Sequence, residues 1–363
     1  MSSGFISQTK APCPSDLLDR AKARGKCRLL VVRASAALPM QAAHDAVQAG
    51  IAEPVLVGEP DAIKQEADKL GWAVPEEMIV PATGEAEAAT VSANLIRSGL
   101  AGEGPAIGAV MKGQLHTDVF MGALLDKTVG LRTGGRLVHL FAIFPPDGSA
   151  PVLVSDAAVN VSPDDKTKQQ SMAEMVRLSP LIGQDRPRLA VLSATETPID
   201  SMPASSEAAR QADWARDNLS GADISGPLSL DLALSEASVA LKGLTGDAVA
   251  GRANCFLMPE IVAGNILYKA FVYLGGGCAA GIVVGGSIPV LLTSRADPPE
   301  ARLASIALAA VARNPQQVDR AHREMRGGGL PSPSSARQWD HTAVLSWLWL
   351  RRSGRPHQSH RMS

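Results

Sequence analysis

The sequence has few aromatic residues, no excess of either charge and no long apolar run. Aromatic residues make up 4% of the 363 residues, which disfavours a protein that stacks nucleic-acid bases on its surface. Lys and Arg number 35 and Asp and Glu 36, so the chain lacks the basic excess that neutralises phosphate backbones. No stretch approaches the roughly 20 apolar residues of a membrane-spanning helix. We therefore expect neither nucleic acid nor a membrane among its partners.

Cysteine is also scarce, and the four cysteines are widely spaced. Cys13, Cys27, Cys255 and Cys278 form no Cys-x-x-Cys pair, so neither a disulfide framework nor a structural zinc site is expected. Residues 1–14 are polar and lack the apolar core of a secretory signal. These features predict reduced, mostly buried thiols in a cytoplasmic protein.

Short aliphatic runs instead alternate with stretches of helical period. Strands are expected at 29–32, 54–57, 107–110, 137–141, 151–154, 189–192, 255–258, 281–284 and 288–292. Helices are expected at 40–50, 61–70, 85–100, 166–182 and 205–219. Several runs are apolar at successive positions, as strands covered on both faces are. The alternation predicts an α/β fold with a mainly parallel sheet.

Turn-rich stretches and a change of composition suggest the domain limits. Turn residues at 145–149 and 285–287 predict a second α/β domain, 146–284, inserted into a first made of 1–145 and 285–313. Residues 314–363 carry eight Arg and three acidic residues, a net +5, with Gly and Pro-Ser runs. We expect this tail to be disordered and outside the α/β core.

A hydroxyl and a guanidinium, Ser294 and Arg295, follow the predicted strand at 288–292. Asp297 has the position of a helix N-cap, and Glu300 follows it at the spacing of a capping box. Ser294 and Arg295 would then precede a helix N-terminus, where free N–H groups bind anions and arginine grips phosphate. The alternative is a capped surface helix with a solvated arginine.

A second polar stretch follows the predicted strand at 107–110. It contains Lys112, His116, Thr117 and Asp118, at the carboxyl end of a strand, where open α/β sheets bind ligands. Thr117 or Asp118 could equally cap the next helix, and His116 could be a structural side chain. Further on, Arg132 lies in a glycine turn at 130–136.

A third stretch leads from the strand at 255–258 into the sequence Ala263-Gly264-Asn265, which predicts a turn before a helix with Tyr268 and Lys269. Small residues there would let a ligand or a facing domain approach the backbone closely, although simple helix–sheet packing would explain them too. Dinucleotide-binding, P-loop and nucleophile-elbow motifs are all absent from the sequence, which argues against the commonest nucleotide-cofactor enzymes.

Six motifs in order resemble those of the phosphate acetyl/butyryltransferase family over residues 28–313. They begin at Lys112, Gly130, Ser155, Gly226, Ala263 and Leu292 and read KGQLHTD, GLRTG, SDAAVN, GPLSLD, AGNILYK and LTSRAD. The resemblance implies a two-domain fold related to the isocitrate and isopropylmalate dehydrogenases, with the active site in the cleft between the domains. It also implies a homodimer and the reaction acyl-CoA + phosphate ⇌ acyl phosphate + CoA, with no metal or nicotinamide cofactor.

The resemblance also implies roles for individual residues. Arg295 would hold the phosphate and Ser294 would donate a hydrogen bond to the acyl carbonyl oxygen. The remaining candidate substrate-binding residues are Lys112, His116, Thr117, Asp118, Arg132, Asn265, Tyr273 and Asp297.

Three positions depart from the family pattern. Ala301 replaces the proposed thiol base of acetyl-type members, which leaves the adjacent Glu300 as candidate base. Tyr273 replaces an arginine, as in butyryl-type relatives, and Val262 replaces a carboxylate. Acetyl is the expected acyl group, with butyryl as the alternative. An oxidoreductase on the same fold, or a binding paralogue that has lost catalysis, would be the other classes.

Overall fold

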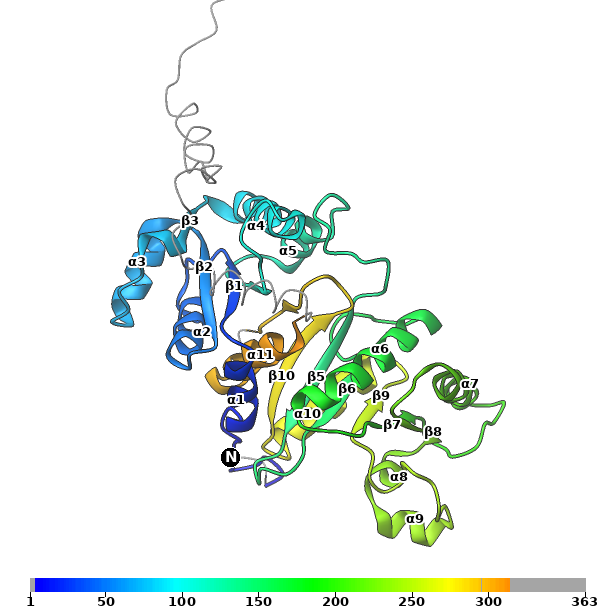
Figure 1. The fold of residues 1–363 in the computed structure, drawn as a ribbon. Coiled ribbons are helices and arrows are strands. Elements are labelled where there is room, and N and C mark those ends of the chain that lie inside the picture. Colours follow the sequence, from blue (N-terminus) through cyan, green and yellow to red (C-terminus); the bar gives the residue numbers. More distant parts are fainter. Residues whose placement is uncertain (1–3, 295, 314–363) are drawn as a thin grey trace, which may run out of the picture. The chain divides into compact units, whose positions relative to one another are not determined.

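The computed structural model describes residues 4–294 and 296–313, so the predicted tail at 314–363 lies outside the described residues (Figure 1). Contacts divide the chain into one unit, Met1–Arg320, and a second, Ala321–Ser363. All the elements below belong to the first unit.

Eleven strands of the described chain form a single sheet. They are β1 (Cys27–Val32), β2 (Ala52–Gly58), β3 (Ile79–Pro81), β4 (Ala109–Lys112), β5 (Val138–Phe144), β6 (Val152–Ser155), β7 (Arg188–Leu192), β8 (Asp223–Leu228), β9 (Cys255–Leu257), β10 (Cys278–Val284) and β11 (Val290–Leu291). The helices are α1 (Ser15–Ala23), α2 (Ala37–Gln48), α3 (Pro60–Lys69), α4 (Gly84–Ala101), α5 (Thr117–Leu124), α6 (Asp165–Leu178), α7 (Pro203–Asn218), α8 (Leu230–Leu234), α9 (Glu236–Lys242), α10 (Ile261–Tyr273) and α11 (Pro299–Ala312). Short 3-10 helices span Glu76–Met78 and Ser179–Ile182. Each expected strand and helix overlaps an observed one, whereas β3 and β8 were not predicted.

The sheet order is β3-β2-β1-β4-β11-β10-β5-β6-β9-β7-β8, and seven of its ten strand pairs are parallel. This confirms the α/β fold with a mainly parallel sheet. The antiparallel pairs all involve β5 or β10, which separate two parallel blocks. Strand β5 pairs with both β6 and β10, so hydrogen bonds cross the predicted limits at 145/146 and 284/285, and those limits stay a prediction.

Helix α11 is buried almost all round, as expected of a helix that is apolar on every side. It packs between α1, α2 and β10 (Figure 1). At its end, the buried Arg313 guanidinium donates to the carbonyl oxygens of Arg24, Gly25, Lys26 and Ala310. These bonds hold the C-terminal end of α11 against the loop before β1.

All four cysteines lie in the described chain as free thiols, and three of them are buried, as the sequence predicts. Burial raises the pKa of the Cys27 thiol to about 11 and that of Cys255 to about 12, so both are unreactive. Within the described residues no helix is both long and apolar enough to cross a membrane.

Candidate active site

Ser294 lines two hollows, one small and polar, the other large and mostly apolar. Strand β11 lies between β4 and β10, and the chain continues past its end through Thr293, whose hydroxyl donates to the Lys112 carbonyl oxygen over 3.4 Å. The small hollow encloses about 410 Å³ and the large cleft about 1510 Å³, both including space open to solvent. Thr293 and Ser294 therefore both lie where two spaces of very different size meet.

Two cationic side chains line the small hollow. Lys112, at the end of β4, donates from Nζ to the Leu115 carbonyl oxygen over 2.9 Å. Arg302, on the first turns of α11, is only 5% exposed, and its Nη1 donates to the Asp297 carbonyl oxygen over 2.6 Å. This composition suits a small anion.

The large cleft follows β10 along its first half and is bounded by α10, by the chain from Leu292 into α11, and by part of the N-terminal segment. A row of rings forms part of its wall: Phe141 stacks on Tyr268 with ring centroids 4.0 Å apart, and His139 lies 4.4 Å from Phe141. Burial lowers the pKa of His139 to about 4, partly opposed by the charge of Asp156, so its imidazole is neutral at pH 7. Tyr273 also lines the cleft. Aromatic and aliphatic surface of this size is typical of a site for an organic ligand.

The turn between Ser294 and α11 differs from the expected capping box. Helix α11 begins at Pro299, its N-cap is Pro298, and no described side chain caps it. The prediction of Asp297 as N-cap is therefore wrong. The physical reason is the Pro-Pro pair, because a residue before proline avoids helical dihedrals, and Pro298 is extended at ψ 161°.

Asp297 instead stabilises the turn that carries Ser294. Its carboxylate accepts a hydrogen bond from the Ser294 backbone N–H over 2.7 Å. Burial raises the pKa of Asp297 above its usual range, while the Ser294 bond and the Arg302 charge act in the opposite direction. Ser294 Oγ accepts a bond from the Ala296 N–H over 3.2 Å, which leaves the hydroxyl proton available to a ligand.

Glu300 is exposed on the first turn of α11 and lines the large cleft. In the described residues its carboxylate accepts no hydrogen bond that would complete a capping box. Arg295 lies outside the described residues. Three predicted residues thus line the large cleft with Ser294: Asp297, Glu300 and Tyr273.

The predicted group after β4 is only partly assembled. Lys112 lines the small hollow, but His116 is 79% exposed and its Nδ1 pairs with Glu85 over 2.8 Å. That contact lowers the pKa of Glu85, chiefly through the bond that its carboxylate accepts from the His116 backbone N–H. Helix α5 begins at Thr117 with His116 at the N-cap position, so capping by Thr117 or Asp118 is wrong.

Some predicted residues lie elsewhere in the described part of the chain. His116, Thr117, Asp118, Arg132 and Asn265 line neither of the two hollows, as far as residues 4–294 and 296–313 are concerned. Arg132 is exposed and forms an isolated antiparallel bridge with Gly286.

Residues 263–265 lie inside α10 rather than in a turn. The helix begins at Ile261, because the Glu260 carboxylate caps it by accepting the N–H groups of Val262 and Ala263. A Cβ atom at Gly264 would overlap the carbonyl oxygen of Asp156, so glycine permits close contact between α10 and the loop after β6. Asn265 donates to the Ala157 carbonyl oxygen of the same loop over 3.1 Å. Helix–sheet packing therefore accounts for this motif.

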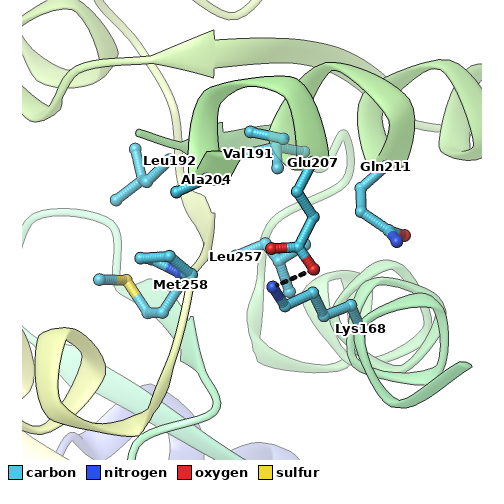
Figure 2. A pocket seen from close by; sticks show the side chains of 10 residues that line it. Lys168, Val191, Leu192, Ala204, Glu207, Gln211, Leu257 and Met258 are labelled. Carbon is cyan, nitrogen blue, oxygen red and sulfur yellow. Dashed lines mark ion pairs between the residues drawn. The ribbon is translucent and has the colours of Figure 1, made fainter. Parts of the chain in front are cut away.

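A separate, narrower hollow lies between α6, α7 and the ends of β7 and β9. Figure 2 shows Lys168 of α6 and Glu207 of α7 pointing toward each other there, with Nζ and Oε1 2.7 Å apart. The Lys168 side chain is only 5% exposed and its charge is satisfied by this partner, which favours a structural role.

Replacing Glu207 with glutamine should therefore lower the free energy of unfolding by about 1–3 kcal/mol, because the buried Lys168 ammonium loses its charged acceptor. Urea unfolding measures this loss, and activity at 25 °C should remain within twofold. An unchanged urea midpoint would show that the ion pair contributes nothing to stability.

Sequence reasoning missed Arg302 and the ring wall of His139 and Phe141. An arginine in the first turns of a helix is ordinarily solvated. The signal was the almost continuous apolar sequence that follows it, 303–312, which predicts a helix buried on all sides and hence a buried charge at its start. The sequence predicts His139 and Phe141 only as parts of a strand, and no local feature of it indicates that they line a cleft.

The comparisons with known proteins show which family the chain belongs to. The family model "Phosphate acetyl/butaryl transferase" matches residues 87–310. A phosphate butyryltransferase of Clostridium acetobutylicum is 36% identical over 82% of this chain and 97% of its own length. A phosphate acetyltransferase of Rhizobium meliloti is 34% identical over 81% of this chain and 92% of its own. The chain belongs to the phosphate acetyl/butyryltransferase family and is an acyltransferase that moves acyl groups to and from phosphate.

Solved structures agree at the level of the fold. A branched-chain phosphotransacylase from Enterococcus faecalis has a TM-score of 0.67 and 26% identity, covering 79% of this chain and all of that one. The EutD phosphotransacetylase from Staphylococcus aureus has a TM-score of 0.66 at 21% identity, covering 82% of this chain and 98% of that one.

Proposed function

We propose that phosphate binds in the small hollow and acyl-CoA in the large cleft, with the acyl carbonyl at Ser294 between them. The observation that carries this proposal is that Ser294 lines both spaces. The positive charge of Lys112 in the small hollow suits a phosphate. The aromatic rings that line the large cleft suit an organic thioester.

In the direction of CoA acylation, the CoA thiolate attacks the carbonyl carbon of the acyl phosphate. A carbon–sulfur bond forms, the carbon–oxygen bond to phosphate breaks, and inorganic phosphate leaves. The Ser294 hydroxyl donates to the carbonyl oxygen as negative charge develops there. Lys112 and Arg295 hold the leaving phosphate, and holding both substrates in one geometry removes much of the entropic barrier. The proposed reaction involves no metal and no nicotinamide cofactor.

Glu300 is proposed to accept the thiol proton without being indispensable. We expect Glu300→Gln to lower kcat about tenfold, less than the 10²–10⁴-fold of a full general base. It should leave the melting temperature unchanged, because Glu300 caps no helix in the described chain. A loss below threefold would show that the pocket ionises CoA without this carboxylate.

Asp297 is the other carboxylate that could act as the thiol base, and the pH–rate profile distinguishes it from Glu300. Since burial raises its pKa, any role of Asp297 as base would place the acidic limb above the usual aspartate range. Our proposal predicts that Glu300→Gln changes this limb. If Glu300→Gln leaves the limb in place and Asp297→Asn removes it, the base is Asp297.

We propose acetyl as the acyl group, supported by the resemblance to the Rhizobium meliloti phosphate acetyltransferase. Butyryl is the second candidate, because Phe141 and Tyr268 offer apolar surface beside the cleft and a relative of similar identity is a phosphate butyryltransferase. The ratio of kcat/KM for acetyl-CoA and butyryl-CoA, at saturating phosphate, tests the choice. A ratio below one would replace acetyl with butyryl.

We also propose the two-domain arrangement of the isocitrate and isopropylmalate dehydrogenases, supported by the two parallel blocks on either side of β5 and β10.

A homodimer in the cytoplasm is proposed as well. Helix α10 supports the dimer, since Val262 is 59% and Ile266 64% exposed, and apolar surface of this kind is typical of interfaces. Sedimentation equilibrium tests it, and a monomer at micromolar concentration would contradict it.

A further inference from the structure

We propose that Arg302 is a further phosphate-binding residue, which contacts inorganic phosphate in the small hollow beside Ser294. This inference rests on the proposed placement of phosphate in that hollow. Arg302 lies outside the six sequence motifs, but it is buried, only partly hydrogen-bonded and without a paired anion in the described chain.

The Arg302 guanidinium is buried but only partly hydrogen-bonded. It is 5% exposed, and Nε is buried with no partner within residues 4–294 and 296–313. Its one bond in that part of the chain is from Nη1 to the Asp297 carbonyl oxygen. Arg313, at the other end of α11, is also buried, yet its Nε, Nη1 and Nη2 all donate to carbonyl oxygens. Because buried donors are normally satisfied, Arg302 has bonding capacity left for a ligand.

The charge on Arg302 also lacks a bonded counter-ion. In the described chain no carboxylate lies within ion-pair distance of Arg302. The nearby Asp297 carboxylate accepts the Ser294 N–H instead, and the Arg302 charge only opposes the rise that burial causes in the pKa of Asp297. Lys112 adds a second cation to the same hollow. A buried guanidinium without a paired anion is costly, and a phosphate would supply both the charge and the acceptor oxygens.

The competing explanation is that Arg302 only holds the turn 294–297 through the Asp297 carbonyl oxygen. A merely structural arginine would affect the melting temperature, or kcat and both KM values together. Replacing an arginine that binds phosphate would raise the KM for phosphate and leave the KM for acyl-CoA unchanged. Comparing the two KM values therefore separates the two explanations.

The test compares Arg302→Met and Arg302→Lys with Arg177→Met as a matched control. Arg177 also donates to a carbonyl oxygen of α11, that of Ala312 over 3.2 Å, but lies outside both hollows. We expect Arg302→Met to raise the KM for phosphate about tenfold or more while the KM for acyl-CoA stays within twofold. The KM of Arg302→Lys for phosphate should lie between those of the wild-type protein and Arg302→Met, because an ammonium keeps the charge but not the planar pair of donors. Arg177→Met should leave both KM values unchanged.

A second readout does not depend on turnover. Inorganic phosphate alone should raise the melting temperature of the wild-type protein, and this shift should be lost in Arg302→Met. If the wild-type protein shows phosphate-dependent turnover but Arg302→Met keeps its KM for phosphate and its thermal shift, Arg302 does not bind phosphate. If Ser294→Ala leaves turnover unchanged, the proposed placement of the substrates fails instead, whatever Arg302 does.

Discussion

Replacing Ser294 with alanine is expected to lower kcat about 10²–10³-fold, the usual cost of losing one hydrogen-bond donor to a developing oxyanion. The geometry supports this size of effect. Within residues 4–294 and 296–313, Ser294 Oγ accepts a bond from the Ala296 N–H and donates none, so its proton can go to the substrate, and Ser294 lines both hollows. Steady-state release of CoA thiol measures the effect.

A loss of catalysis in Ser294→Ala can be distinguished from a loss of folding. Alanine keeps the backbone N–H that donates to the Asp297 carboxylate and loses only the bond that Ser294 Oγ accepts from the exposed Ala296 N–H, so the melting temperature should change little. Ser193→Ala, which removes a hydroxyl that contacts Met202 outside both hollows, serves as the control and should keep full activity. A loss below fivefold in Ser294→Ala would remove the serine from the chemistry.

Replacing Arg295 with lysine is expected to lower turnover about 10²-fold or more, because an ammonium cannot make the two parallel bonds of a guanidinium to phosphate. The reason lies in the sequence, where Arg295 directly follows Ser294 in the LTSRAD motif. The KM for phosphate should rise as well, since the lost contact exists in the bound state.

Arg136→Lys is the matched control for that variant. Arg136 is an exposed arginine that pairs with Asp164 over 2.7 Å, and its replacement should change turnover less than twofold. Unchanged turnover and phosphate KM in Arg295→Lys would take Arg295 out of the site. Lys112 and Arg302 would then be the remaining cations proposed to bind phosphate in the small hollow.

The sheet was predictable because most of its strands are continuous aliphatic runs. The two strands that were missed show the limit. Strand β3 has three residues and ends in Pro81, and β8 contains Gly226 and Pro227, which predict a turn. Both are edge strands, where proline is tolerated because one side of the strand needs no hydrogen-bond donor.

The candidate site could be predicted only where reactive side chains stand directly at the end of a predicted strand. Ser294 follows β11 and Lys112 ends β4, and the carboxyl ends of neighbouring parallel strands meet at one edge of a sheet. His116 and Asn265 have equally suggestive sequence contexts, yet they bond to Glu85 and to the Ala157 carbonyl oxygen. Arg302 has no suggestive local sequence, yet it lines the small hollow, because the packing of α11 in the core buries its guanidinium there.

The most direct test of the account is release of CoA thiol from acetyl-CoA by the purified protein, with and without inorganic phosphate, in the presence of a metal chelator and without nicotinamide. We expect release that depends on phosphate and yields one acyl phosphate for each thiol. Butyryl-CoA in place of acetyl-CoA checks the acyl group in the same assay. Thiol release that is independent of phosphate, or no release from either thioester, would contradict the account.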